Sequence, residues 1–485
     1  MRNRRSALLL LALVFAWAPP ARSETPDWKQ IPKPPLRPFA PQQPTKITLD
    51  NGLVVILQRD TELPIVHGHA RIRGGAREEP AAKAGLVELY GEAWRTGGTK
   101  SRTGDALDDF LEARAASVET SGGLDSTTIS FDCLKDNLDD VFGIFTELLR
   151  EPAFREDKLL LAKDGLDTEI ARRNDNPAQI ASREARKLAY GASSPYGRTP
   201  EYQTVARVGV KDLLEWHARY VHPNNIILGI SGDFDPKAME ARVRRAFGAW
   251  PRGALAERAR AEFKDPKPGL YFVAKDDVNQ SNIRMVHMGT TRDNPDYYAL
   301  KVMNEIFGGG FSSRLVSNVR SKKGLAYGVW GGVGTGYDAP GIFQCGLGTK
   351  SETTSAAIDA LYEEIDNLKK VPFTDEELKR AKDSILNSFI FRFDSRDKVL
   401  GEKMLYEFYG YPADFLERYR VAIEKVTAED VARAVGKYVR RDALAVLVVG
   451  KAADFDRPLS SFGPVTTIDV SIPPPAEAPA PSQSK

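Results

Sequence analysis

The sequence predicts an α+β fold made of two copies of one domain, each a mainly antiparallel sheet packed with helices. Three observations support this prediction. Short apolar strands come in antiparallel-looking pairs, helices stand between them in blocks, and two landmarks recur at nearly the same offset. A chain of 485 residues is also too long for one compact domain.

The repeated landmarks are a helix-to-strand junction and a helix start. The junction Tyr220–Gly232 (YVHPNNIILGISG) returns at an offset of 218 as Tyr438–Gly450 (YVRRDALAVLVVG). The helix start Phe154–Asp164 returns at an offset of 219 as Phe373–Asp383. We therefore assign a first domain, a charged linker and a second domain to residues 46–250, 251–269 and 270–458.

Local patterns place the elements of the first domain in order. Asp50-Asn51-Gly52 is a turn signal, so the apolar run Leu53–Gln58 after it is a predicted strand. A second predicted strand covers His67–Ile72, and Ser126–Phe131 alternates like a half-buried strand. Apolar residues at helical spacing predict helices over Leu138–Leu149 and Leu159–Ile170.

The two ends of the chain differ from the rest. Three arginines precede the apolar run Ala7–Ala18, and small residues spaced for a signal peptidase follow it. The run has 12 residues, fewer than the ~20 that span a bilayer. We expect a signal peptide over residues 1–23 rather than a membrane anchor, and an exported protein of the periplasm or cell envelope. Proline-rich composition predicts an extended lead-in over 24–45 and a tail over 459–485.

Composition excludes several classes of function. The 68 basic and 66 acidic side chains nearly cancel, which argues against a nucleic-acid partner. Cys133 and Cys345 are too few for a disulfide scaffold or a thiolate metal site, although a single bridge between them stays open. His67 and His69 share one face of a strand, but no third ligand at the usual spacing accompanies them.

One stretch points to a known family. Residues Gly74–Glu92, followed by Gly98-Thr99, resemble the insulinase, pitrilysin and mitochondrial processing peptidase family. In that family this stretch carries His-x-x-Glu-His on a helix, where both His bind zinc and the Glu activates a water. A third ligand, a Glu, follows after 76 residues. The resemblance covers Lys46–Asp454 and implies the processing-peptidase fold.

This sequence departs from the family on the catalytic atoms. The three motif positions fall at Glu88, Gly91 and Glu92, and 76 residues further on the distal position is intact as Glu169. Catalytic zinc sites use imidazole nitrogens with one carboxylate, whereas carboxylates alone suit Mg²⁺ or Ca²⁺, and Gly91 offers no base. We expect no zinc and no peptidase activity from this chain by itself.

Two alternatives remain for this helix. Glu88 and Glu92 form either a solvated helix face over an empty cleft or a site for a replacement metal. The spacing also predicts that Glu88→His, Gly91→Glu and Glu92→His together would create a zinc site with Glu169.

The second copy carries a different signal. Asn304–Leu315 and Val319–Tyr327 are similar to the family segment in which an Arg and a Tyr, seven residues apart, hold the bound peptide. Arg320 and Tyr327 fit that spacing, and their side chains are donors suited to a peptide carbonyl. In the alternative interpretation Arg320 caps a helix end and Tyr327 packs in the core.

The resemblance implies that such chains work in pairs, in which one partner carries zinc and the other supplies the Arg and Tyr contacts. We interpret this chain as the non-catalytic subunit of an exported heterodimer, without a cofactor of its own, that holds an unfolded peptide for an active zinc-containing family member. The peptide would add as a strand at a sheet edge near Ser126–Phe131. The alternatives are a stand-alone peptide-binding or envelope scaffold protein, and a hydrolase with a carboxylate-bound metal.

Overall fold

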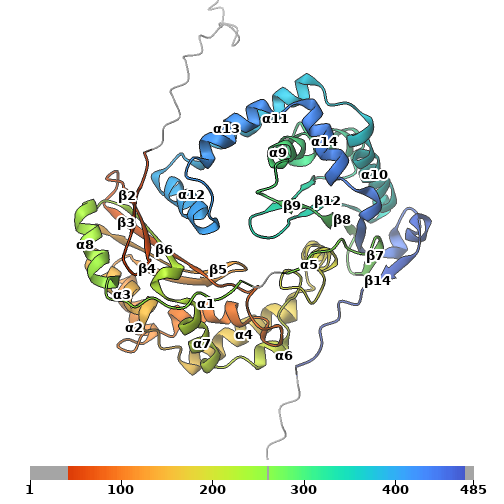
Figure 1. Ribbon diagram of the computed structural model, residues 1–485. Coiled ribbons are helices and arrows are strands. Elements are labelled where there is room, and N and C mark those ends of the chain that lie inside the picture. The colour runs from red at the N-terminus through yellow and green to blue at the C-terminus, as the bar shows by residue number, and fades with distance from the viewer. Residues whose placement is uncertain (1–41, 259–260, 476–485) are drawn as a thin grey trace, which may run out of the picture. The chain divides into compact units, whose positions relative to one another are not determined.

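The computed structural model describes residues 42–258 and 261–475 (Figure 1). The predicted signal peptide, all but the last residues of the predicted lead-in and the end of the predicted tail lie outside these ranges. In the part of the chain that is described, no helix is both long and apolar enough to cross a bilayer.

The first sheet has six strands among the described residues and is mainly antiparallel. Its order is β1-β2-β6-β3-β5-β4, and the β2–β6 pair is parallel while the other pairs are antiparallel. The strands are β1 (Thr45–Thr48), β2 (Val54–Arg59), β3 (Ile65–Arg73), β4 (Ser117–Gly122), β5 (Ser126–Leu134) and β6 (Ile226–Gly232). The predicted strands over Leu53–Gln58, His67–Ile72 and Ser126–Phe131 are confirmed by β2, β3 and β5, with bounds that differ by three residues or fewer.

The second sheet repeats this order strand for strand. It runs β14-β7-β13-β8-β12-β10 within the described ranges, and β13 is parallel to β7 as β6 is to β2. The strands are β7 (Gly269–Ala274), β8 (Gln280–Met288), β10 (Val329–Val333), β12 (Ile342–Lys350), β13 (Ala445–Gly450) and β14 (Val465–Thr467). The α+β prediction and its internal repeat are therefore confirmed.

The outermost strand is where the copies differ. β1 is antiparallel to β2, whereas β14 is parallel to β7. β14 also lies in the segment that we assigned to the tail, so the second sheet continues beyond residue 458. Two further short strands, β9 (Thr290–Thr291) and β11 (Thr335–Gly336), pair with each other in parallel.

Helices stand in blocks between the strands in both copies. Those of the first are α1 (Leu86–Thr96), α2 (Gly104–Glu112), α3 (Leu138–Arg150), α4 (Glu156–Arg172), α5 (Pro177–Tyr190), α6 (Tyr202–Ala206), α7 (Val210–Tyr220) and α8 (Pro236–Phe247). Those of the second are α9 (Tyr297–Asn304), α10 (Thr354–Lys370), α11 (Asp375–Phe389), α12 (Arg396–Tyr409), α13 (Phe415–Lys425) and α14 (Ala428–Tyr438). Both helices predicted from apolar spacing lie inside α3 and α4.

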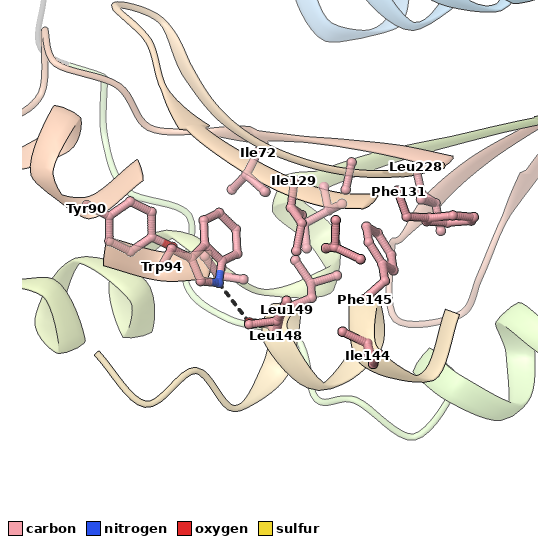
Figure 2. Packing of buried hydrophobic residues seen from close by; sticks show 14 of the residues in the cluster. Ile72, Tyr90, Trp94, Ile129, Phe131, Ile144, Phe145, Leu148, Leu149 and Leu228 are labelled. Atoms are coloured by element: carbon pink, nitrogen blue, oxygen red, sulfur yellow. Dashed lines mark hydrogen bonds between the residues drawn. The ribbon is translucent and has the colours of Figure 1, made fainter. Parts of the chain in front are cut away.

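The first core lies between the first sheet and the helices on one of its faces (Figure 1). Figure 2 shows Phe131 of β5 against Phe145 of α3, with ring centroids 5.1 Å apart, and Trp94 of α1 further along the same core, next to Tyr90. The indole nitrogen of Trp94 donates to the Leu148 carbonyl at 2.8 Å. Removing each such apolar side chain from water contributes about 1.5–3 kcal/mol to the stability of the fold. This packing fixes α1, the helix that carries the motif positions.

One helix of each copy packs against the sheet of the other copy. α5, from the first copy, packs its small residues Ala181, Ala185 and Ala189 on β8 and β13. α12, from the second copy, packs Leu400, Met404 and Phe408 on β2 and β6. Gly229 of β6 makes room, because a Cβ there would overlap the Met404 sulfur. The exchange joins both sheets in one compact unit, in which each sheet is covered on one face by a helix of the other copy.

The two cysteines lie in different sheets and are both free and buried. Cys133 lies on β5 and Cys345 on β12. Burial raises the pKa of the Cys133 thiol to about 12 and that of the Cys345 thiol as well. The structure thus answers the question left open by the sequence with two unbridged, unreactive thiols.

Candidate functional site

Helix α1 begins at a carboxylate cap that the sequence did not reveal. Gly85 precedes the helix with a φ of +101°, a conformation that favours glycine. The buried Glu79 carboxylate accepts hydrogen bonds from the amides of Gly85 at 3.1 Å and Val87 at 3.0 Å. Burial raises the pKa of Glu79 even though these amides hold it down. A negative group at this end stabilises the helix.

The inner side of α1 is anchored by a polar pair inside the core. The Tyr90 hydroxyl lies 2.8 Å from Nδ1 of His217 on α7, and Nε2 of His217 lies 3.1 Å from the Leu149 carbonyl. Burial lowers the pKa of His217 to about 3, so the ring is neutral. Since a carbonyl only accepts, Nε2 carries the proton and Nδ1 accepts from Tyr90. With this side held in the core, Glu88 and Glu92 on the outer side of α1 stay exposed.

The four motif-equivalent residues lie in one cleft. Glu88, Gly91 and Glu92 of α1 face Glu169 of α4 across a cavity of about 580 Å³. The third wall is the end of strand β4, residues Thr120, Ser121 and Gly122. The predicted spacing between the motif and Glu169 therefore corresponds to proximity in space.

Gly91 leaves no room for a side chain. A Cβ atom on Gly91 would overlap the amide nitrogen of Gly122 and stand 2.8 Å from the Ser121 carbonyl carbon. The reverse also holds, because a Cβ on Gly122 would overlap the Val87 carbonyl oxygen. The Thr120 hydroxyl donates to the Gly91 carbonyl at 2.6 Å, and this hydrogen bond holds β4 against α1. The predicted replacement Gly91→Glu therefore requires β4 to move, which the sequence prediction did not foresee.

The carboxylates of Glu88, Glu92 and Glu169 in the cleft form no ion pair with the described residues. Burial by the cleft walls and, second, the Glu169 carboxylate raise the pKa of Glu88. Lys158, which also lines the cleft, is already paired with Asp105 at 2.5 Å. Within the described residues no group of three or more His, Cys, Asp or Glu side chains has the arrangement to hold a metal ion.

These residues do not fit a catalytic zinc. The donors that line the cleft are carboxylates without an imidazole, and the position of the family's base is a glycine with no space around it. The arrangement can offer negative charge and a strand edge to a ligand, and Gly91 has no side chain that could act as a base.

Arg320 and Tyr327 form a second group. The Arg320 guanidinium carbon lies 5.2 Å from the Tyr327 ring centroid, and Tyr327 is 90% exposed. The alternative in which Tyr327 packs in the core is therefore wrong. Arg320 forms no ion pair within the described ranges. Neither residue lines the cleft between α1 and α4, and their role in substrate contact stays a prediction.

The predicted site of strand addition needs a correction. Ser126–Phe131 belongs to β5, which is paired on both sides, with β3 and with β4. The edge strand beside the cleft is β4 (Ser117–Gly122), which pairs with β5 and with no other strand of the described residues. The alternation of Ser126–Phe131 identified a strand, but pairing partners of a strand are long-range and are not encoded in its own pattern.

Sequence reasoning missed the β4 residues and the lysine of the cleft. Thr120, Ser121, Gly122 and Lys158 carry no motif, and the one local signal is the small-residue run Ser121-Gly122-Gly123 at the strand end. The histidines behave as ordinary residues. His67 is paired with Asp132, and burial, followed by the Arg71 charge, lowers the pKa of His69 to about 4.

Two sequence models of known families match the chain. Residues 54–198 match the model described as insulinase (peptidase family M16). Residues 207–385 match the model described as peptidase M16 inactive domain. The two matched segments include the cleft residues and Arg320 with Tyr327, respectively.

Individual relatives are similar over most of their length. A Helicobacter pylori protein named non-peptidase homolog YmxG is 23% identical over 78% of this chain and 87% of its own. An uncharacterized zinc protease of Mycobacterium bovis is 25% identical over 85% of this chain and 95% of its own. A Bacillus subtilis protein named uncharacterized zinc protease YmxG is 22% identical, over 73% and 86%.

Solved structures share the fold. The structure of a peptidase M16 inactive domain from Pseudomonas fluorescens superposes with a TM-score of 0.76, at 24% identity, over 84% of this chain and 98% of that one. A protease from Helicobacter pylori superposes with a TM-score of 0.74, at 20% identity, over 84% and 100%. At these sequence identities the similarity shows a shared fold.

Proposed function

The chain belongs to the insulinase family, peptidase family M16, and we propose that it is a non-catalytic member that holds an unfolded peptide for a zinc-containing partner of the same family. The observation that carries the proposal is the contact of Gly91 with β4. Where the family places its catalytic glutamate, this chain has backbone against backbone. Such a cleft has lost the water-activating group and the space for it.

The remaining parts of a peptide site support retention of binding. β4 presents an edge beside the cleft, where an extended peptide can add as a strand through main-chain hydrogen bonds. One carbonyl of this strand, that of Val118, already accepts from Arg95 Nε at 3.0 Å, so the peptide would engage the end nearer Gly122. The name non-peptidase homolog, given to the Helicobacter relative, agrees with a member that lacks the chemistry.

A partner is proposed because Arg320 and Tyr327 do not line the chain's own cleft. Both side chains offer donors to solvent, Arg320 without a carboxylate partner in the described residues and Tyr327 almost fully exposed. Donors of this kind stabilise a peptide carbonyl or the oxyanion formed from it. The zinc and the base would come from the partner, and the exported location proposed from residues 1–23 would place both proteins in the periplasm or envelope.

The first experiment concerns the chain alone. The purified mature protein should contain less than stoichiometric zinc by metal analysis and should leave unstructured peptides uncut. Cleavage that is abolished by a chelator and by Glu169→Gln would overturn the proposal, because it would show a working metal centre in this cleft.

The second experiment looks for the partner. Native co-purification from the source organism, followed by mass spectrometry, should recover a family member with an intact His-x-x-Glu-His motif. Reconstitution of the two should give peptide cleavage that neither shows alone. Recovery of the chain free of any such partner, with undiminished peptide binding, would favour the stand-alone scaffold instead.

A further inference from the structure

A second cavity, of about 340 Å³, lies where strand β3 ends beside the linker between the two copies. It is lined by Arg73, the last residue of β3, by Gly74 after it, by Tyr220 at the end of α7, and by residues 255–258 of the linker. The lining mixes charged and polar side chains with an aromatic ring and two aliphatic side chains. Its volume is at the lower end of the range for small-molecule sites. It shares no residue with the cleft between α1 and α4.

Arg73 forms no ion pair and no side-chain hydrogen bond with the described residues. Its guanidinium carbon lies 4.6 Å from the centre of the Phe408 ring of α12, which supports the group but offers it no hydrogen-bond acceptor. Burial and, second, the charge of Arg258 lower the pKa of Arg73. The fold therefore holds this cation in surroundings that disfavour its charge, and an anion in the cavity would compensate it.

The carboxylates whose charges reach Arg73 are bound by other cations. Asp338, in the loop before β12, accepts from Arg77 at 3.0 Å and from Arg258 at 2.6 Å, so two guanidinium groups already share it. Glu407 of α12 also acts on Arg73 and is paired with a lysine of β1 at 2.6 Å. Because neither carboxylate contacts Arg73, the donors of its guanidinium group stay available to a ligand.

Two carboxylates in the lining limit the charge of that ligand. Glu78 is bound by Arg77 at 2.6 Å. Glu257 is exposed and forms no ion pair with the described residues. Both would repel a dianion such as phosphate more strongly than a group with a single negative charge. The lining therefore favours a monoanion.

The hydroxyl of Tyr220 is a second donor without a partner. Tyr220 is 4% exposed, and its hydroxyl forms no hydrogen bond with the described residues. The ring packs on Trp216 and over Gly74, where a Cβ would stand 2.5 Å from a ring carbon. A hydroxyl in a buried side chain costs free energy unless a ligand or a water bonds to it. A phenol and a guanidinium group that line one cavity are suitable donors to a carboxylate.

We propose that this cavity binds a small carboxylic acid, whose carboxylate accepts hydrogen bonds from the Arg73 guanidinium group and the Tyr220 hydroxyl. The aliphatic part of the acid packs against Leu255 and Ala256. The C-terminal carboxylate of a peptide has the same chemistry, and the tests separate the two sources. The site is independent of the proposed peptide-holding function, because it uses no residue of the cleft.

The first test offers isovalerate and its neutral amide, isovaleramide, to the full-length protein in chloride-free buffer at pH 8. Saturation-transfer NMR should detect isovalerate, with a dissociation constant on the order of 1 mM, but not isovaleramide. Arg73→Met, which keeps an unbranched side chain over Phe408, should weaken isovalerate binding about tenfold or more through loss of the charged donor. The matched control is Arg71→Met, since Arg71 also lies over the Phe408 ring, at 5.0 Å, but does not line the cavity. This control should bind isovalerate as the unmodified protein does.

Tyr220→Phe gives a second variant, in which the ring stays and only a hydroxyl without a partner in the described part of the chain is lost. It should weaken isovalerate binding about fivefold, as expected for one hydrogen bond. Equal signals from the acid and the amide on the unmodified protein would overturn the site. Isovalerate binding that survives both Arg73→Met and Tyr220→Phe would overturn it as well.

Two further probes identify the source of the carboxylate. If Gly-Gly-Leu with a free C-terminus binds at least tenfold more tightly than isovalerate, and its C-terminal amide does not bind, the site takes peptide ends. If the free tripeptide binds no more tightly than isovalerate, the site takes small acids. Inorganic phosphate, mostly a dianion at pH 8, should not displace isovalerate at equal concentration. Displacement by phosphate would contradict the assignment of a carboxylate site.

Discussion

Gly91 of α1 and Gly122 of β4 meet backbone to backbone, so that a Cβ on either residue would overlap main-chain atoms across the contact. The helix and the strand can approach this closely because both residues lack side chains. The family's catalytic glutamate would stand on Gly91. A side chain at Gly91 and the present helix–strand contact therefore exclude each other, so a glutamate at this position requires the contact to open.

We predict that Gly91→Ala destabilises the protein by about 1–3 kcal/mol, the range for overpacking a tight site. The matched control is Gly165→Ala, in helix α4 on the wall of the same cleft. A Cβ there meets nothing within 4 Å, so the alanine should stabilise by about 0.5–1 kcal/mol through helix propensity. Urea unfolding of both variants measures the difference. If Gly91→Ala left the free energy of unfolding unchanged, β4 would have to move aside at no energetic cost.

We predict that Glu88→His with Glu92→His, and Gly91 left in place, binds zinc together with Glu169. The two positions are four residues apart on the exposed side of α1, and Glu169 is close enough to raise the pKa of Glu88. The variant should still fail to cleave peptides, because no base is present. Calorimetry with zinc measures the site, and added Glu169→Gln should weaken it at least tenfold. Peptide cleavage by the two-histidine variant would contradict the role given to Gly91.

The fold was predictable from sequence because its signals are local and occur twice. The apolar run of β6 returns as β13, and the helix start of α4 returns as that of α11. The exchange of α5 and α12 between the sheets was not predictable. Ala181 and Ala185 read as an ordinary apolar helix face, and nothing in such a face states which sheet it covers.

The motif residues of the candidate site could be predicted from the sequence, whereas the strand that completes the cleft around them could not. Motif spacing identified Glu88, Gly91, Glu92 and Glu169, and the structure places all four in one cleft. The edge strand was misassigned because pairing depends on contacts far along the chain. The lack of space at Gly91 depends on Gly122, which lies 31 residues further along the chain and is recognisable as its partner only when the two backbones meet in the fold.

We predict a pH-dependent gain of stability from Glu88→Gln. The pKa of Glu88 is raised above the ordinary value of 4.5 by burial and by Glu169. The folded state therefore holds the proton more tightly, and its stability falls as pH rises from that ordinary value through the raised one. Near pH 7 the variant should be more stable by less than about 1 kcal/mol, a small effect because the side chain is exposed. Below pH 4 the unmodified protein and the Glu88→Gln variant should have the same melting temperature.

The partner of this repulsion supplies the control. Glu169→Gln removes the second cause of the shift and should also stabilise the protein near neutral pH. Because the two substitutions relieve one repulsion, their combination should gain less than the sum of the single effects. Strict additivity in thermal melts would place the origin of the Glu88 shift in burial alone.

We predict that Tyr90→Phe costs about 1–3 kcal/mol in urea unfolding. The substitution removes the donor to Nδ1 of His217 and leaves that nitrogen unpaired in the core. The control Tyr202→Phe removes a half-buried hydroxyl that has no protein partner in the described part of the chain, and it should change stability by less than about 0.5 kcal/mol. Equal effects would mean that the Tyr90 bond adds nothing to the anchoring of α1.

The last prediction concerns Arg320 and its neighbour in sequence, Arg314. Arg320→Ala in the reconstituted pair should leave melting temperature and assembly unchanged, because the side chain has no ion pair within the described residues and lies over an exposed ring. Turnover by the zinc-containing partner should fall by about 10²–10³, the typical cost of losing a donor to the transition state. Tyr327→Phe should cost less, since only a hydroxyl is lost.

Arg314→Ala is the matched structural control, because it removes an arginine six residues away that serves the fold. Arg314 is buried, binds Glu377 through two bonds and donates to the carbonyls of Val371 and Pro372. Its loss should cost about 3 kcal/mol by leaving Glu377 unpaired, and activity should fall only with the folded fraction. Turnover and thermal unfolding measured on the same samples separate the two patterns. Arg320→Ala that lowers stability, with activity falling only with the folded fraction, would contradict the substrate-holding role of this segment. Full activity of the pair with both Arg320→Ala and Tyr327→Phe would contradict it as well.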